Sequence, residues 1–135
     1  MTGQYTDLAH GITTIDTGFM RPGFTASHLI VEKGEAAFVD VGPTATHSAL
    51  LNTLQHKHIV PEQVRYVIVT HVHLDHAGSV GTLAQQFPNA QIMVHPKGAR
   101  HVMNPEKLIT GASAVYGEKR MKSLFGEMVP VPPER

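Results

Sequence analysis

The sequence contains no cysteine. Disulfide bonds, thiolate metal ligands and cysteine nucleophiles are therefore all excluded, because each of them requires a sulfhydryl side chain. A metal site in this chain would have to use histidine and carboxylate side chains, which suit zinc, iron or manganese. Histidine is unusually frequent, with 10 residues in a chain of 135.

An excess of charge of one sign is also lacking. Lysine and arginine together number 11, aspartate and glutamate also number 11, and no block of like charge occurs. Nucleic acids and anionic membranes attract proteins through dense positive charge, so neither is expected as the main partner. The expected partner is a small-molecule substrate.

Long apolar runs are absent as well. The first 18 residues show no basic start followed by an apolar stretch, and no run approaches the length of a membrane span. We therefore expect a cytoplasmic protein. A length of 135 residues with 41% hydrophobic and 16% charged residues predicts one globular domain over residues 1–135.

Strand-like and helix-like patterns alternate through the middle of the chain. The predicted strands are a weak edge strand at 11–18, a hairpin of 29–32 and 36–41, and buried strands at 65–70 and 90–95. The predicted helices are 44–58, with Thr44 as its N-cap, 78–87, 96–103 and 110–126. This alternation predicts an α/β arrangement with crossover connections.

Most of the chemistry lies in one stretch, "YVIVTHVHLDHAG", which spans 66–78. Three histidines and one aspartate, namely His71, His73, Asp75 and His76, follow directly after a predicted strand. In an extended segment, residues two apart point the same way, so His71 and His73 can chelate one ion and Asp75 continues that register. His76 would point elsewhere unless the chain turns. The pattern predicts two adjacent metal positions; the alternative is a polar loop in which Asp75 or His76 caps a helix.

The segment "THVHLDHAG" resembles the T-H-x-H-x-D-H signature of the metallo-β-lactamase-fold hydrolases. The preceding "HLIVEKGEAAFVDVGPT" is similar to the strand–turn–strand of that family, which ends in an aspartate and a glycine. The resemblance begins near Gly11 and implies an α/β (α+β) fold. It corresponds to the N-terminal half of an αββα sandwich, with a mixed sheet and helices on its outer face.

The resemblance also implies a function. It assigns His71 and His73 to a first metal, Asp75 and His76 to a second, and Asp40 to bracing the metal loop. One or two zinc ions are expected, with iron or manganese as alternatives. The implied reaction is hydrolysis of an ester, thioester or lactone by hydroxide generated at the metal, and Asp75 near that solvent could also handle a proton.

The chain departs from the family pattern in its ligand count. Family members supply a further histidine to each metal and a bridging aspartate, all of them downstream of this region. This sequence supplies only two ligands for each metal. His95 and His101 are the candidates for additional ligands. The alternative is a catalytically incomplete half-domain that binds metal without turnover or self-associates, in which case a homodimer could bring two histidine clusters face to face.

Within the family, two features narrow the expected class. Position 73 is histidine and not glutamate, which disfavours the oxygen-reducing di-iron branch, and Asp75 together with His76 favours a glyoxalase II-like thioesterase or a lactonase. The lack of an export signal disfavours a periplasmic antibiotic-degrading enzyme. An iron-dependent relative such as a sulfur oxidiser stays open. The pocket walls are expected from the loop 19–25 and the region 96–109.

Overall fold

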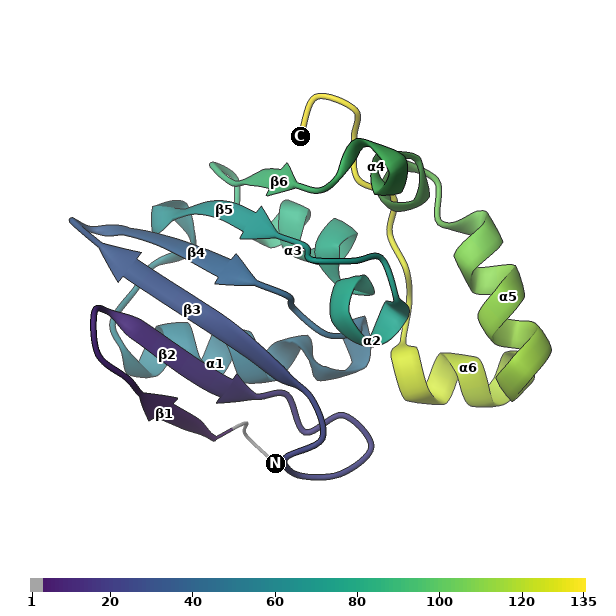
Figure 1. Cartoon of the computed structure of the whole chain (residues 1–135), viewed down its shortest axis with the longest axis horizontal. Helices are drawn as coiled ribbons and strands as arrows, with labels where there is room; N and C mark the ends of the chain where they lie inside the picture. The colour runs from purple at the N-terminus through teal and green to yellow at the C-terminus, as the bar shows by residue number, and fades with distance from the viewer. Residues whose placement is uncertain (1–3) are drawn as a thin grey trace.

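The computed structural model describes residues 4–135, and in these residues six strands form a single mixed sheet (Figure 1). The strands lie side by side in chain order, and they are β1 (Tyr5–Asp7), β2 (Ile12–Asp16), β3 (Ala26–Glu32), β4 (Glu35–Val39), β5 (Val64–Ile68) and β6 (Gln91–Met93). The pairs from β1 to β4 are antiparallel, whereas β4–β5 and β5–β6 are parallel. Parallel neighbours require crossover segments, and helices supply both of them.

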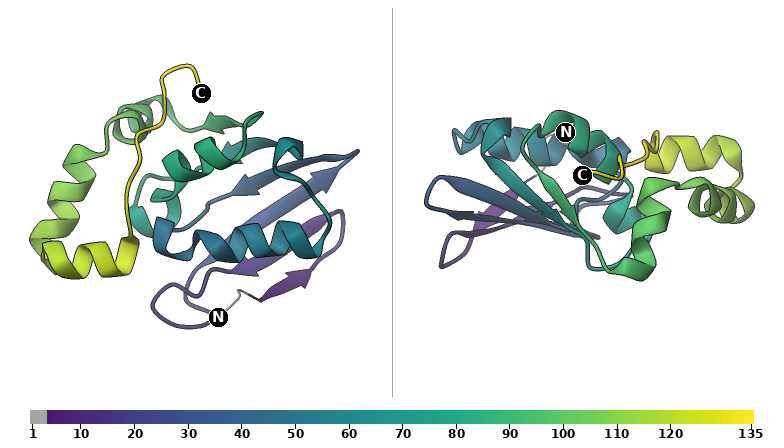
Figure 2. Two further views of the ribbon diagram at one scale, coloured as in Figure 1. Left: turned by 180° about the vertical axis from the view of Figure 1, so that it is seen from behind. Right: turned by 90° about the horizontal axis from the view of Figure 1, so that it is seen from above.

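The helices divide into two groups by position. The α-helices are α1 (His47–His56), α2 (Leu74–Ala77), α3 (Val80–Gln86), α4 (Pro96–Met103), α5 (Glu106–Tyr116) and α6 (Glu118–Phe125), and short 3-10 turns η1 (Thr44–Thr46) and η2 (Pro61–Gln63) precede α1 and β5. Helices α1 and α3 cover one face of the sheet, whereas α5 and α6 extend beyond its end (Figure 2). None of the helices described in 4–135 has the length and apolar character needed to span a bilayer.

The main core lies between the sheet and the two helices α1 and α3. Residues alternate along the strands, so that Ile15, Leu29, Phe38 and Val67 point inward and are fully buried. Phe38 stacks on Phe87 at the end of α3, with ring centroids 5.8 Å apart. This packing confirms the predicted α+β class, with a mixed sheet and helices on its outer face.

The opposite face of the sheet has no helix over it in the part of the chain that the structure describes (Figures 1 and 2). The inward residues alternate with a second set, which includes half-buried Ile30, Val39 and Ile68. Tyr66 and Met93 lie in the same set and are 46% and 50% exposed. These apolar side chains are interspersed with polar Thr14, His28 and Gln91 on the same side of the sheet. We call this side the open face.

The prediction of a weak edge strand at 11–18 is wrong in one respect. The strand exists as β2, but β1 pairs outside it, with Thr6 opposite Thr14. Thr13 and Lys57 hold the carboxylate of Asp7 in β1 at 2.9 and 2.6 Å. The Lys57 ammonium, followed by the Thr13 hydroxyl, keeps the pKa of Asp7 below its ordinary value. A three-residue strand has too few positions for an alternation to show in the sequence.

Two helix predictions are also wrong in detail. The predicted helix 110–126 is two helices, α5 and α6, because Gly117 adopts φ +80° and the chain changes direction there (Figure 1). Thr44 does not cap a helix, since the residue before the first turn is Pro43. The Thr44 hydroxyl instead donates to the carbonyl of Glu127, which ties α6 to the start of η1.

The C-terminal residues 126–135 pass against the first turn of α3 and return to the edge of β6 (Figure 2). The Val131 N–H donates to the Val102 carbonyl at 2.9 Å, and the Ile92 N–H donates to the Arg135 carbonyl at 2.8 Å. The crossing is so close that a Cβ built at Gly81 would lie 1.6 Å from the Val129 carbonyl oxygen. Only glycine at position 81 lets this segment lie against α3.

We predict opposite effects for alanine at two helical glycines. Gly81→Ala should destabilise the protein by about 1–3 kcal/mol, because the added methyl overpacks against the Val129 carbonyl. Gly111→Ala is the matched control, since its Cβ would meet nothing within 4 Å. It should stabilise by about 0.5–1 kcal/mol, the usual gain for glycine to alanine in a helix. Urea denaturation checks both, and equal effects of the two substitutions would contradict the close crossing at Gly81.

Candidate metal centre

The candidate site lies where β4 and β5 end. These strands are parallel neighbours, so their carboxyl ends meet at the same edge of the sheet, which is where open α/β sheets commonly place their ligands. The first residue after β4 is Asp40, whose N–H donates to the Ile68 carbonyl at 2.8 Å. The chain leaving β5 reaches Thr70 and His71 two and three residues later.

Asp40 occupies an unusual backbone conformation, with φ 53°, which residues other than glycine seldom adopt. Its carboxylate compensates by accepting two hydrogen bonds from one residue. Oδ1 accepts from the Thr70 N–H at 2.9 Å, and Oδ2 accepts from the Thr70 hydroxyl at 2.7 Å. The side chain is 15% exposed. Asp40 therefore links the ends of the two strands, as a residue that braces the metal loop should.

The histidine segment is not extended as far as Asp75, contrary to the prediction from the sequence, because a helical turn begins at Leu74. The chain is non-helical through His73, and α2 begins at Leu74, with the N–H groups of His76 and Ala77 donating to the His73 carbonyl at 3.0 and 2.9 Å. Asp75 therefore does not continue the register of His71 and His73. The helical turn instead brings His76 back toward His71, whose ring centroid lies 4.3 Å away.

The backbone around α2 fixes this turn. The N–H groups of Val41 and Gly42 both donate to the His76 carbonyl, at 2.8 and 3.1 Å. Gly78 allows the close approach, because a Cβ there would lie 2.6 Å from the Leu74 carbonyl oxygen and 3.1 Å from the Pro43 Cα. The loop that follows Asp40 and the turn that carries His76 are thus held together.

Three of the five predicted side chains come within chelating distance at this edge, but not as the predicted pairs: Asp40 joins His71 and His76, whereas His73 and Asp75 lie outside this group. One ligand atom each from Asp40, His71 and His76 lies within 4.8 Å of the others, and this is the sole such group of three in residues 4–135. The His73 ring centroid is 5.0 Å from that of His71. Asp75 Oδ2 is 3.4 Å from His76 Nε2. Imidazole nitrogens and carboxylate oxygens at these separations fit a divalent ion such as zinc.

The hydrogen bonds of Thr70 determine which nitrogen of His71 is free. The Thr70 hydroxyl gives its one proton to the Asp40 carboxylate, and it also lies 2.9 Å from His71 Nδ1. The hydroxyl must therefore accept at that second contact, so Nδ1 carries the ring proton. The Nε2 lone pair of His71 is then available to a metal, and the Asp40–Thr70–His71 chain orients the ring.

The two candidates for extra ligands lie elsewhere. His95 is the N-cap of α4, and its Nδ1 accepts a hydrogen bond from the Lys97 N–H at 3.1 Å. His101 lies in the same helix and is half-buried. Neither belongs to the group of ligand atoms found in the described residues. The structure therefore does not bring His95 or His101 to the cluster.

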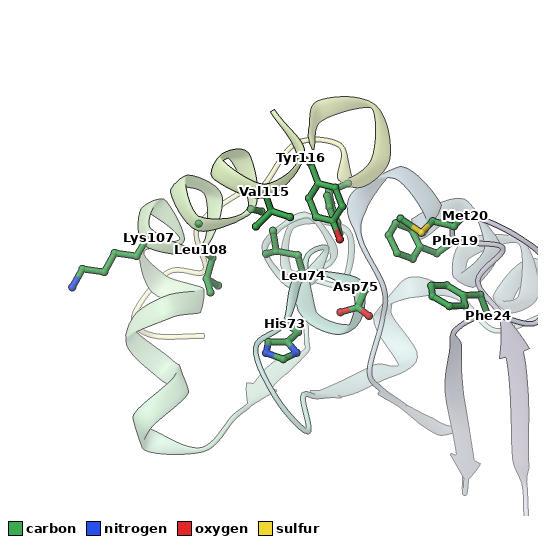
Figure 3. Close-up of a pocket in the computed structure, with 13 residues that line it drawn as sticks. Phe19, Met20, Phe24, His73, Leu74, Asp75, Lys107, Leu108, Val115 and Tyr116 are labelled. Carbon is green, nitrogen blue, oxygen red and sulfur yellow. The ribbon is translucent and has the colours of Figure 1, made fainter. Parts of the chain in front are cut away.

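A cavity of about 570 Å³ opens beside His73 and Asp75 (Figure 3). The predicted loop 19–25 lines it through Phe19, Met20 and Phe24. The predicted region 96–109 supplies only Lys107 and Leu108, whereas most of the opposite wall comes from the rest of α5 and from Phe125. The sequence reasoning missed this wall, and it also missed Thr70, although the threonine opens the quoted motif.

Comparison with known proteins agrees with this geometry. The sequence model of the metallo-beta-lactamase superfamily matches residues 20–133. The chain is similar to the metallo-beta-lactamase FEZ-1 from Legionella gormanii, with a TM-score of 0.68, 15% identity, 96% of this chain covered and 45% of that one. A motif mutant of a Cronobacter sakazakii metallo-beta-lactamase gives a TM-score of 0.67 and 18% identity over 95% of this chain and 45% of that one. These similarities establish the fold.

Among curated proteins, the chain is similar to the uncharacterised protein YobT of Bacillus subtilis (strain 168). The two are 28% identical over 67 residues, which is 50% of this chain and 28% of YobT. The chain thus spans 28% of this relative's length and 45% of the length of both lactamase structures.

We predict that Thr70→Val lowers zinc affinity by about 10- to 100-fold, because it removes the hydroxyl that orients His71, a typical loss for such supporting residues. Thr70→Ser is the matched control and should keep most of the affinity. Nitrogen-15 NMR of the metal-free protein should show His71 with its proton on Nδ1 in the parent and in Thr70→Ser. An unchanged tautomer and unchanged zinc affinity in Thr70→Val would contradict this role.

Proposed function

This chain belongs to the metallo-beta-lactamase superfamily, and from that premise we propose that it acts as a metal-dependent hydrolase of an ester, thioester or lactone. The observation that supports the proposal is the group of Asp40, His71 and His76 ligand atoms within 4.8 Å of one another at one sheet edge, with His73 and Asp75 beside it. An isolated polar loop would not need such a strained aspartate to hold its histidines in place.

In this proposal, His71 and His73 hold one ion, and Asp75 with His76 hold a second. Zinc is the proposed metal, and manganese or iron are the alternatives that the same ligands accept. When bound, the metal supplies Lewis acidity and makes water reactive at neutral pH. Asp75 is placed to take or return a proton at its carboxylate, since it faces both His76 and the cavity. Thr70 positions His71, and the Asp40 carboxylate, which accepts from Thr70, also lies within ligand distance of His71 and His76.

A second candidate function rests on the open face. The described residues leave Tyr66 and Met93 exposed on a sheet surface that also carries Ile30, Val39 and Ile68. Apolar surfaces of this extent usually contact another protein layer. The chain provides four histidine and aspartate ligands for two ions, whereas a catalytic zinc commonly takes three protein ligands for each ion. The alternative is therefore a metal-binding unit that self-associates and does not turn over substrate by itself.

The first test removes the proposed ligands of one ion. The double variant His71→Ala with His73→Ala should lose tight zinc binding, measured by competition with a chromophoric chelator, and any zinc-dependent thioester or lactone hydrolysis should disappear with it. A variant lacking two histidines away from the site, His56→Ala with His58→Asn, is the control; asparagine tolerates the left-handed backbone at position 58, where φ is 59°. Equal zinc binding by the two double variants would contradict the ligand assignment.

The second test concerns the open face. If self-association covers it, light scattering after size exclusion should give a dimer mass for the parent chain. Tyr66→Glu with Met93→Glu should then give a monomer, because charges cannot be buried there without a partner. Val60→Glu is a control at a comparably exposed residue, 51% exposed and located before η2. A monomeric parent at millimolar concentration would rule out the self-associating alternative.

A further inference from the structure

The cavity beside His73 and Asp75 has an uneven distribution of polar groups. Its walls are mainly apolar, and they come from the loop between β2 and β3, from Leu74 in α2, and from α5 and α6. The one cationic lining residue is Lys107, whose ammonium points away from the cavity (Figure 3). The polar side chains that face it are His73 and Asp75 at one end, with the Tyr116 hydroxyl on their side. An occupant should therefore have one polar end and an uncharged apolar remainder.

Helix α5 forms this wall, and it contacts the smaller apolar cluster of Phe19, Leu74, Met121 and Phe125 through half-buried Leu108, Ile109 and Ala112. It contains no buried residue, although its sequence "EKLITGASAVY" is largely apolar in its second half. Val115 is 77% exposed, and Tyr116 is 36% exposed. Across the cavity, Met20 and Phe24 are 48% and 43% exposed. Large apolar side chains on both walls thus remain in contact with water, and an apolar ligand between them would remove that contact.

The floor of the cavity consists of packed aromatic rings, and the cavity is present without a ligand. Phe19 is 3% exposed and packs against Phe125 and Phe24, with ring centroids 5.3 and 6.2 Å apart. Leu74, which is 7% exposed, belongs to the same cluster and lies between the two metal-site residues His73 and Asp75 in sequence. The apolar cavity and the metal edge are therefore continuous through α2.

Gly111 keeps part of this space open. It lies in α5, lines the cavity, and a Cβ built on it would meet nothing within 4 Å. Its backbone is helical, so no special conformation demands glycine there. Glycine in the middle of a helix is unfavourable relative to alanine. We therefore explain the glycine at position 111 by the room that it leaves for a ligand.

We propose that this cavity binds the straight hydrocarbon chain of the substrate's acyl group, with the reacting carbonyl at the His73 and Asp75 end. The inference rests on the proposed hydrolase function, which it narrows to substrates with an extended apolar acyl chain, because a cavity of about 570 Å³ is of ordinary ligand size. Charged or strongly polar acyl groups would be rejected, because the walls offer them no hydrogen-bond partners.

The test uses binding and does not depend on turnover. The probes are straight-chain carboxylates from butanoate to decanoate, titrated into the whole chain with and without zinc and followed by nitrogen-15 NMR. Dissociation constants should fall by roughly fourfold for each added methylene until the cavity is full. The largest amide shifts should fall on Leu74, Ala112 and Val115. A dissociation constant that does not change with chain length would overturn the proposal.

Two variants distinguish the effect of filling the cavity from the effect of disturbing helix α5. Gly111→Phe fills the cavity from a position with free space, so it should remove the chain-length dependence while zinc affinity stays at the parent value. Ala114→Phe adds the same ring to an exposed residue of α5 that does not line the cavity, and it should bind the carboxylates as the parent does. Equal loss of binding in both variants would attribute the effect to the helix and overturn the proposal.

The outcomes also separate this inference from the proposed function. Chain-length-dependent binding without zinc binding would support the cavity and refute the metallohydrolase. Zinc binding together with carboxylate affinities that do not change with chain length would refute the cavity proposal and leave the metallohydrolase proposal standing. If Gly111→Phe converts a dimer into a monomer and no carboxylate binds, the apolar walls are a contact between two copies of the chain, and the acyl-binding proposal is wrong.

Discussion

The two hydrogen bonds between Asp40 and Thr70 are the interaction on which the site depends. They join the ends of β4 and β5, and the same threonine hydroxyl sets the proton position of His71. A left-handed backbone at a residue other than glycine costs about 1–3 kcal/mol. A hydrogen bond to a charged group contributes about 1.5–3 kcal/mol, so two of them offset that cost. Both hydrogen bonds thus stabilise the strained conformation of Asp40, and only the one from the Thr70 hydroxyl depends on the threonine side chain.

The rest of the site follows from this link. Since Asp40 is held at the end of β4, the next two N–H groups reach the His76 carbonyl and fix the turn of α2. Leu74 in that turn then packs into the smaller apolar cluster with Phe19, Met121 and Phe125, apart from the main core. One short helical turn therefore connects two regions of different character, a polar edge that can hold metal and an apolar cluster that shapes the adjoining cavity.

Features that depend on neighbouring residues could be predicted from the sequence. Features that depend on contacts between residues far apart in the chain could not. His71, His73, Asp75 and His76 lie within six positions after an apolar strand, so both their clustering and their place at a strand end could be predicted. The role of Thr70 could not, because it depends on Asp40, 30 residues earlier in the chain. The helical start at Leu74 was missed because backbone bonds from Val41 and Gly42 hold that turn. Gly117 was visible, but a glycine alone does not say that the chain reverses there.

Helix α5 forms a wall of the cavity, whereas the candidate metal ligands lie near the ends of β4 and β5. This separation bears on how substrate specificity could change. Its residues are all at least partly exposed, so substitutions at outward positions such as Ala114 and Val115 should perturb folding less than changes in the buried strands. Leu108, Ile109 and Ala112 are the exceptions, because they pack against the smaller apolar cluster. The metal edge, by contrast, depends on the hydrogen bonds that link Asp40, Thr70 and His71, so it should tolerate fewer substitutions. If the cavity binds an acyl chain as proposed, mutations in this one peripheral helix would change which acyl groups fit, at small cost in stability and without altering the metal edge.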